Sequence, residues 1–293
     1  MPETLDIRKP ESVVDAAPIS GAPFGIEVKI DLSSNLSELE KSALRQLYRR
    51  DGLLLVRDQH LTQSQQIEAS AIFGPVLRED SAMISNVEKN GILGSLELLF
   101  HNDLPYLPAP FLGAALFALE VTEPAVPTRF ASGMTAYERL PADLRQRIDP
   151  LNALHVRARA NARRSKLTDS QPGDNCAVHA LVGRQETTDR PYIFANLDMT
   201  ALVIGMSEAE SDDLLEELFS YMYADVNVYN HPWRRGDIVF WDNLALQHAR
   251  SEIPGGIRTL QRTTMAKWSA LAQNPVDLTP DIQNNLILDT VGG

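Results

Sequence analysis

Two residue types that commonly bind metals stand close together in one apolar stretch of the sequence. His101 and Asp103 are two positions apart within residues 98–104, which we expect to form a strand. Because alternate side chains of a strand project from the same face, the imidazole and the carboxylate would face one ion. His-x-Asp pairs also arise by chance, and a polar strand edge is the alternative interpretation.

A third histidine and two arginines follow much later in the chain. Residues 233–248 contain a Gly-Asp turn, an apolar strand and a loop that ends at His248. His248 lies 145 residues after Asp103 (248 − 103), so only the fold can bring them together, and a structural core histidine is the alternative. Arg258 and Arg262 share one face of the next expected strand. A guanidinium facing inward would bind a carboxylate in bidentate fashion, whereas one facing outward would be ordinary surface charge.

Together these residues predict a site for oxygen chemistry. Two histidines and one carboxylate form the facial triad of non-haem iron oxygenases, in which other coordination positions stay open. A zinc-dependent hydrolase could use the same three ligands but gives Arg258 no role. A non-catalytic β-sandwich binding protein, with His101 and His248 as structural residues, is the second alternative.

The elements expected to position these residues are mostly strands. Helical periodicity covers residues 36–51, where Ser37 and Glu40 form a capping box, and a buried strand follows at 52–57. A second helix runs from 62 to about 73. Further short strands are predicted at 98–103, 112–120, 190–195, 237–241 and 258–265, and helices at 135–147 and 207–223. This pattern predicts an antiparallel sandwich or barrel with flanking helices.

One domain is expected from the length of 293 residues. Residues 1–24 contain four prolines and are predicted to form an extended arm, followed by a single domain over 25–293. Residues 156–174 are predicted to form a lid or insert, since they have few large apolar side chains and a cluster of basic ones; a solvated charged face is the alternative. The basic residues are Arg157, Arg159, Arg163, Arg164 and Lys166.

Composition narrows the function classes. The formal charge of −12 argues against a nucleic-acid surface, because such surfaces neutralise phosphates with Lys and Arg. Cys176 is the only cysteine, which excludes intramolecular disulfides and thiolate metal clusters. The N-terminal residues lack a signal-peptide pattern, and the apolar stretch 111–119 is too short to cross a membrane. We therefore expect a cytoplasmic enzyme for a small molecule, without a membrane partner, and a homo-oligomer.

Over roughly residues 25–268 the chain resembles the taurine and 2,4-dichlorophenoxyacetate dioxygenase family of Fe(II)- and 2-oxoglutarate-dependent oxygenases. The resemblance is carried by 100–103 (FHND), 241–243 (WDN), His248 and Arg258-x-x-x-Arg262. It implies a double-stranded β-helix core, that is, a jelly roll of the cupin type. It also implies Fe(II), with 2-oxoglutarate and O₂ as cosubstrates, and a hydroxylation, desaturation or cyclisation that releases succinate and CO₂.

The resemblance also implies roles for single residues. His101, Asp103 and His248 would bind iron and act as the catalytic centre. Arg258 would hold the far carboxylate of 2-oxoglutarate together with Thr128, and Arg262 would lie near its keto-acid end or near the substrate. The candidate substrate contacts are three residues in or near the His-x-Asp segment, together with one arginine of the later strand: Glu97, Asn102, Tyr106 and Arg262.

Two departures from the family pattern point to a substrate unlike taurine. Phe100 stands where the family usually has tryptophan, and the turn before Thr128 is Ala-Val-Pro instead of Gly-Gly-Asp. The sequence leaves two substrate classes open: a small anionic metabolite, and a natural-product intermediate that is either free or tethered to a carrier.

Overall fold

Two packed β-sheets carry the residues singled out above. The computed structural model describes residues 13–77, 82–157, 163–170 and 173–267. Within this part of the chain the larger sheet has eight strands, in the order β1 (Asp15–Pro18), β2 (Ile26–Lys29), β3 (Leu53–Val56), β15 (Ile238–Asp242), β7 (Gly113–Val121), β17 (Arg258–Met265), β4 (Ala82–Ser85) and β5 (Ile92–Leu93). The facing sheet has the order β14 (Val228–His231), β8 (Thr128–Ser132), β16 (Leu246–Arg250) and β6 (Leu98–His101).

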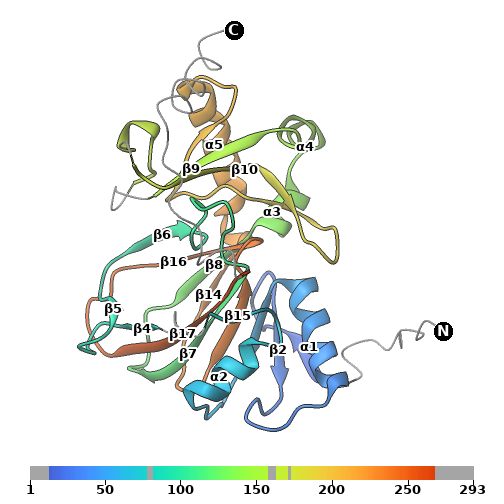
Figure 1. Ribbon diagram of the computed structural model, residues 1–293, viewed down its shortest axis with the longest axis vertical. Helices are drawn as coiled ribbons and strands as arrows, with labels where there is room; N and C mark the ends of the chain where they lie inside the picture. Colours follow the sequence, from blue (N-terminus) through green and yellow to red (C-terminus); the bar gives the residue numbers. More distant parts are fainter. Residues whose placement is uncertain (1–12, 78–81, 158–162, 171–172, 268–293) are drawn as a thin grey trace, which may run out of the picture.

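A smaller unit lies beyond the facing sheet, at the top of Figure 1. It contains the sheet β10 (Cys176–Ala180), β9 (Asn152–Val156) and β13 (Thr200–Val203), and the hairpin of β11 (Val182–Arg184) and β12 (Pro191–Ile193). Its helices are α3 (Gly133–Arg139), α4 (Ala142–Ile148) and α5 (Glu208–Met222), with short 3₁₀ turns η3 (Leu167–Asp169) and η4 (Asp225–Asn227). The helices α1 (Glu38–Asp51) and α2 (Gln63–Ser70) belong to the opposite end, against the larger sheet (Figure 1).

The predicted capping box of α1 is confirmed. The Ser37 Oγ accepts a hydrogen bond from the Glu40 backbone N–H at 3.3 Å, and the Glu40 carboxylate accepts one from the Ser37 N–H at 2.7 Å. The helix ends at Gly52, whose φ of 74° is left-handed and whose N–H donates to the Tyr48 carbonyl at 2.7 Å. This turn leads the chain directly into β3.

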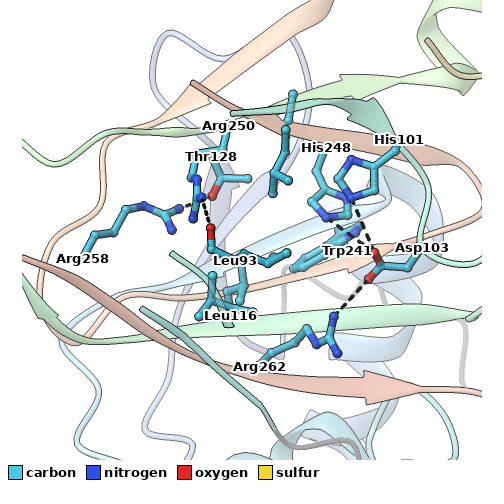
Figure 2. Close-up of a pocket in the computed structure, with 13 residues that line it drawn as sticks. Leu93, His101, Asp103, Leu116, Thr128, Trp241, His248, Arg250, Arg258 and Arg262 are labelled. Carbon is cyan, nitrogen blue, oxygen red and sulfur yellow. Dashed lines mark hydrogen bonds and ion pairs between the residues drawn. The ribbon is translucent and has the colours of Figure 1, made fainter. Parts of the chain in front are cut away.

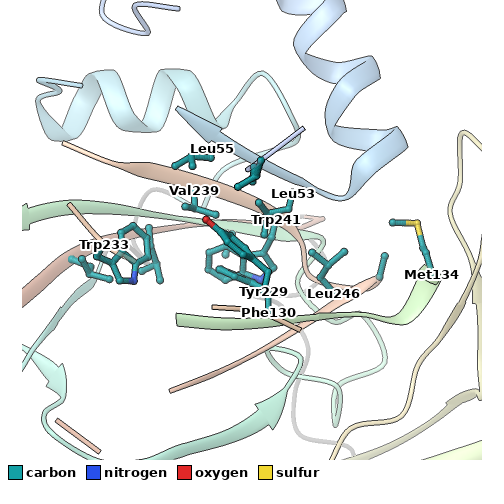
Figure 3. Close-up of a cluster of buried hydrophobic side chains, with 14 of the residues drawn as sticks. Leu53, Leu55, Phe130, Met134, Tyr229, Trp233, Val239, Trp241 and Leu246 are labelled. Atoms are coloured by element: carbon teal, nitrogen blue, oxygen red, sulfur yellow. The ribbon is translucent and has the colours of Figure 1, made fainter. Parts of the chain in front are cut away.

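Strand β3 is buried on both of its faces. Leu53 and Leu55 point into the core between the two sheets, where Trp241 also packs (Figure 3). Leu54 and Val56 point the other way, into the cluster that includes the apolar face of α1. This alternation explains why a continuous apolar run forms a strand here.

Three details of the fold differ from the sequence prediction. The single helix expected at 135–147 is two helices, because Pro141 cannot donate the hydrogen bond that would continue α3 through Leu140. Residues 15–18, within the predicted arm 1–24, form β1 and pair with β2, and Val14 is buried. The expected strand 98–103 ends at His101.

Gly52→Ala is expected to destabilise the protein by about 2–4 kcal/mol, because left-handed backbone disfavours a side chain and the site is overfilled. An added Cβ would meet Leu246 Cδ1 at 2.5 Å and Met134 Cε at 2.9 Å, and both side chains are buried. The matched control is Gly205→Ala, which has a φ of 82° with nothing within 4 Å. Urea unfolding measures both, and equal losses for the two variants would contradict the steric argument.

Candidate active site

Three potential metal ligands meet between β6 and β16. His101 and His248 are direct partners across these antiparallel strands, and their ring centroids are 4.2 Å apart. The Nε2 atoms of the two rings lie 3.6 and 3.9 Å from Asp103 Oδ1. One ligand atom from each residue falls within 4.8 Å of the others, so a single ion can contact all three (Figure 2).

Asp103 reaches this position from a turn, since β6 ends at His101. Asn243 holds the turn: its Oδ1 accepts from the Asp103 N–H at 2.7 Å, and its Nδ2 donates to the Asp103 carbonyl at 3.0 Å. Asn102, which is fully buried, donates to the carbonyls of Asn243 at 2.6 Å and Leu246 at 3.2 Å. The two asparagines therefore join residues 102–103 to the loop between β15 and β16.

The protonation states suit a divalent cation. The His101 Nδ1 lies 2.7 Å from the Leu99 carbonyl, which can only accept, so Nδ1 carries a hydrogen. Burial lowers the pKa of this ring, but the hydrogen bond and charge of Asp103 outweigh it and raise the pKa, so a metal ion would take the place of a proton on Nε2. Burial, with His101 as the next cause, lowers the pKa of His248 to about 3, so this ring is neutral. Burial raises the pKa of Asp103, but the two histidines and Arg262 outweigh it and hold the pKa well below its usual range.

The donor set fits iron. Asp103 Oδ2 is buried and has no hydrogen-bond partner within the described residues, although Arg262 Nη1 lies 4.0 Å away. Two neutral imidazoles and one carboxylate on one side of an ion leave other positions free for ligands that are not part of the protein.

A buried arginine and a threonine lie at the other end of the same pocket. Arg258, only 2% exposed, donates from Nη2 to Thr128 Oγ1 at 2.8 Å and from Nε to the Val126 carbonyl at 3.0 Å. The Trp233 indole N–H also donates to Thr128 Oγ1, at 3.0 Å. Burial and the nearby Arg250 lower the pKa of Arg258 to about 9, so the guanidinium remains charged at neutral pH.

The pocket between these two ends has apolar walls. It encloses about 450 Å³, including its opening to solvent. The polar residues of its lining are the three potential metal ligands, Thr128 and three arginines, namely Arg250, Arg258 and Arg262. The other lining residues are apolar: Ile84, Leu93, Leu98, Leu116, Trp241 and Ala249.

Three of the predicted substrate residues lie outside this lining. Glu97 is exposed on the solvent side of the chain before β6, and Asn102 uses its side chain to hold backbone. Tyr106 is half-buried, with Arg157 and Asp103 as its charged neighbours. Arg250 was missed by the sequence prediction, although its place two residues after His248 on a strand puts both on one face.

Comparison with known proteins shows which family the chain belongs to. Residues 15–264 match the family model described as "Taurine catabolism dioxygenase TauD, TfdA family". The chain belongs to this family. It is 30% identical over 255 residues to the (S)-phenoxypropionate/alpha-ketoglutarate-dioxygenase of Sphingobium herbicidovorans, covering 80% of this chain and 88% of that protein. It is 26% identical over 212 residues to pentalenolactone F synthase of Streptomyces avermitilis, covering 66% and 69%.

Solved structures bear out the fold. A putative alpha-ketoglutarate-dependent taurine dioxygenase from Burkholderia xenovorans superposes with a TM-score of 0.74, covering 92% of this chain and 95% of that one at 23% identity. The predicted double-stranded β-helix core is thus confirmed, with the two sheets described above as its layers.

This TauD/TfdA family member is an Fe(II)- and 2-oxoglutarate-dependent dioxygenase that acts on a small molecule. The zinc hydrolase and the non-catalytic binding protein, which the sequence left open, are not favoured. Within the described residues no helix is both long and apolar enough to span a membrane.

Proposed function

We propose that the enzyme oxidises a free, mostly apolar organic acid above an iron held by His101, Asp103 and His248. The observation that carries this proposal is the single pocket lined by these three donors, by Arg258 and Arg262, and by aliphatic walls. In this assignment Arg258 and Thr128 bind the far carboxylate of 2-oxoglutarate, and Arg262 faces the reacting end from the Asp103 side.

When bound, Fe(II) with 2-oxoglutarate and O₂ supplies the oxidation of a C–H bond, with succinate and CO₂ as products. The protein contributes position and charge. His101 is fixed by its bond to the Leu99 carbonyl, and Asp103 by Asn243. The apolar wall around Trp241 and Leu116 excludes water from the reacting centre.

The described part of the basic segment supports a free substrate over a carrier-tethered one. Arg163 makes two bonds to the Asp169 carboxylate at 2.7 Å. Arg164 and Lys166 both pair with Asp212 of α5. Two carboxylates thus offset part of the charge of these three cations, which leaves an acidic carrier less positive surface than the sequence suggests; Arg157 of the same segment is exposed. Arg159 of the same segment lies outside the described residues.

We also propose a single oxygenase domain over 25–293, with residues 156–174 as a lid or insert, of which 158–162 and 171–172 lie outside the described residues. Its support is that β9 and β10, the strands on either side of this segment, pair directly with each other. The expected homo-oligomer and the cytoplasmic location remain predictions, and light scattering of the purified protein checks the oligomer.

A substrate panel tests this proposal. Apolar carboxylic acids, including aryloxypropionates, are expected to raise succinate release well above the substrate-free rate, because Arg262 and an aliphatic wall suit an acid with an apolar body. Taurine is expected to give no such increase. The control Glu97→Gln should retain the wild-type rate, since Glu97 is exposed and outside the pocket. Turnover of carrier-bound acids alone would contradict the proposal.

A further inference from the structure

Arg250 is a second buried guanidinium in the pocket, and no role above uses it. It is 3% exposed and shares the pocket lining with Arg258. In Figure 2 it lies toward the end of the pocket where Arg258 meets Thr128, away from the three iron ligands. Its charge is therefore at the cosubstrate end.

Neither of these guanidiniums has an anionic partner in the described part of the chain: no carboxylate there forms an ion pair with Arg250 or Arg258. Burial lowers the pKa of both groups, and Arg250 is a further cause for Arg258. Two like charges without counter-ions are costly in a poorly solvated pocket. A bound carboxylate would relieve both the desolvation and the mutual repulsion.

The same guanidinium holds a turn of the pocket wall. Arg250 Nη2 donates to three backbone carbonyls, those of Leu93 at 3.2 Å, Gly94 at 3.0 Å and Leu96 at 2.5 Å. Its Nε is buried and lacks a hydrogen-bond partner among the described residues. The Nη2 of Arg250 thus serves the turn, while its Nε–H has no acceptor among the described residues.

Backbone contacts also hold this turn, since β5 pairs with β4 and the Ile253 N–H donates to the Ser95 carbonyl at 3.1 Å, but its side chains contribute little. Leu93 and Gly94 both have left-handed backbone, with φ of 65° and 44°. The side chains of Ile92, Leu93 and Leu96 are 40%, 39% and 61% exposed, so core packing contributes little to their position. Leu93 nevertheless lines the pocket. The three hydrogen bonds from Arg250 are therefore the side-chain contacts that hold this wall, in addition to the backbone pairing of β5.

We propose that Arg250 is a positioning residue that couples cosubstrate binding to the substrate wall. The far carboxylate of 2-oxoglutarate neutralises the Arg250–Arg258 pair, and the fixed Arg250 in turn orders residues 93–96. This inference rests on the cosubstrate site proposed at Arg258 and Thr128. By linkage, an ordered turn also raises the affinity for 2-oxoglutarate, so cosubstrate and substrate bind cooperatively.

Hydrogen exchange on the anaerobic Fe(II) enzyme tests the coupling. In the wild type, 2-oxoglutarate is expected to slow amide exchange in residues 93–97 by about tenfold, a typical coupling between sites. Arg250→Gln is expected to abolish that slowing and to weaken 2-oxoglutarate binding by about tenfold or more, since charged hydrogen bonds are lost. The binding constant comes from the visible band that 2-oxoglutarate produces with Fe(II).

Arg129→Gln is the matched control. Arg129 pairs with Ala249 in the same sheet, so it projects from the face opposite to that of Arg250, and its guanidinium stacks 4.9 Å from the Phe100 ring centroid. This variant loses the same charge but should keep wild-type 2-oxoglutarate affinity and the slowed exchange at 93–97.

Unchanged exchange of residues 93–97 on adding 2-oxoglutarate to the wild type overturns the inference, even if Arg250→Gln does not fold. If Arg258→Gln weakens 2-oxoglutarate binding while Arg250→Gln keeps both affinity and slowed exchange, only the Arg250 inference fails. If Arg258→Gln binds 2-oxoglutarate as tightly as wild type does, the proposed cosubstrate site fails as well.

Discussion

Asp103→Ala is expected to lower the rate of succinate release by much more than 100-fold. Losing a residue that only orients a metal ligand already lowers metal affinity or activity by roughly 10–100-fold, and Asp103 is assigned as a ligand itself. Asp103 is the single carboxylate of the three-residue group, and its removal leaves two neutral imidazoles for the ion. Fe(II) affinity should fall, and the weak visible band that appears when 2-oxoglutarate is added without O₂ should disappear.

The Asp103 experiment has a carboxylate control and a folding control. Glu97→Gln removes a carboxylate six positions earlier that is exposed and outside the pocket, so its band and Fe(II) affinity should equal those of wild type. Circular dichroism of Asp103→Ala should match wild type, because Asn243 holds the turn through the backbone of residue 103. A wild-type band in Asp103→Ala would refute the ligand assignment.

Arg258→Gln is expected to weaken 2-oxoglutarate binding by about 100-fold or more, since loss of one partner from a buried charge pair costs 2–5 kcal/mol or more. Thr128→Val should have a smaller effect, about tenfold, because only one neutral hydrogen bond to the cosubstrate is lost. Fe(II) affinity should change in neither variant, since both residues lie at the opposite end of the pocket (Figure 2).

Thermal unfolding separates the binding role of Arg258 from a structural one. The free wild-type protein carries this buried charge without a carboxylate partner in the described residues. Removing the charge should offset the loss of its hydrogen bonds to Thr128 and Val126, so Arg258→Gln should change the Tm of the free protein little. Added 2-oxoglutarate should raise the Tm of the wild type but not of the variant. A lower Tm in the absence of 2-oxoglutarate, with unchanged affinity, would make Arg258 a structural residue.

The sequence was most informative where local rules decide the structure. The capping boxes of Ser37 and Ser207 fix the starts of α1 and α5, and both are present. The buried run after Gly52 also forms the strand predicted for it. Each of these features depends on residues within a few positions of one another, which a single sequence displays.

The sequence was least informative where tertiary contacts decide. Asp103 was predicted to share a strand face with His101, but β6 ends first and Asn243, 140 positions away, sets the position of the carboxylate. The spacing of Arg250 from His248 could have placed it on the pocket face, but its significance depends on the lack of a nearby acid among the described residues, which only the fold shows. Pro141 was visible in the sequence and should have divided the predicted helix.

The pocket is built from both layers of the jelly roll, and this has a consequence for the lifetime of the protein. His101, His248 and Thr128 belong to the four-stranded sheet, whereas Arg258 and Arg262 belong to the eight-stranded one. A cosubstrate that contacts the metal at one end and Arg258 at the other would cross-link the two sheets non-covalently. Separation of the layers should then become rarer as 2-oxoglutarate rises, so resistance to cellular proteases would follow the supply of this central metabolite.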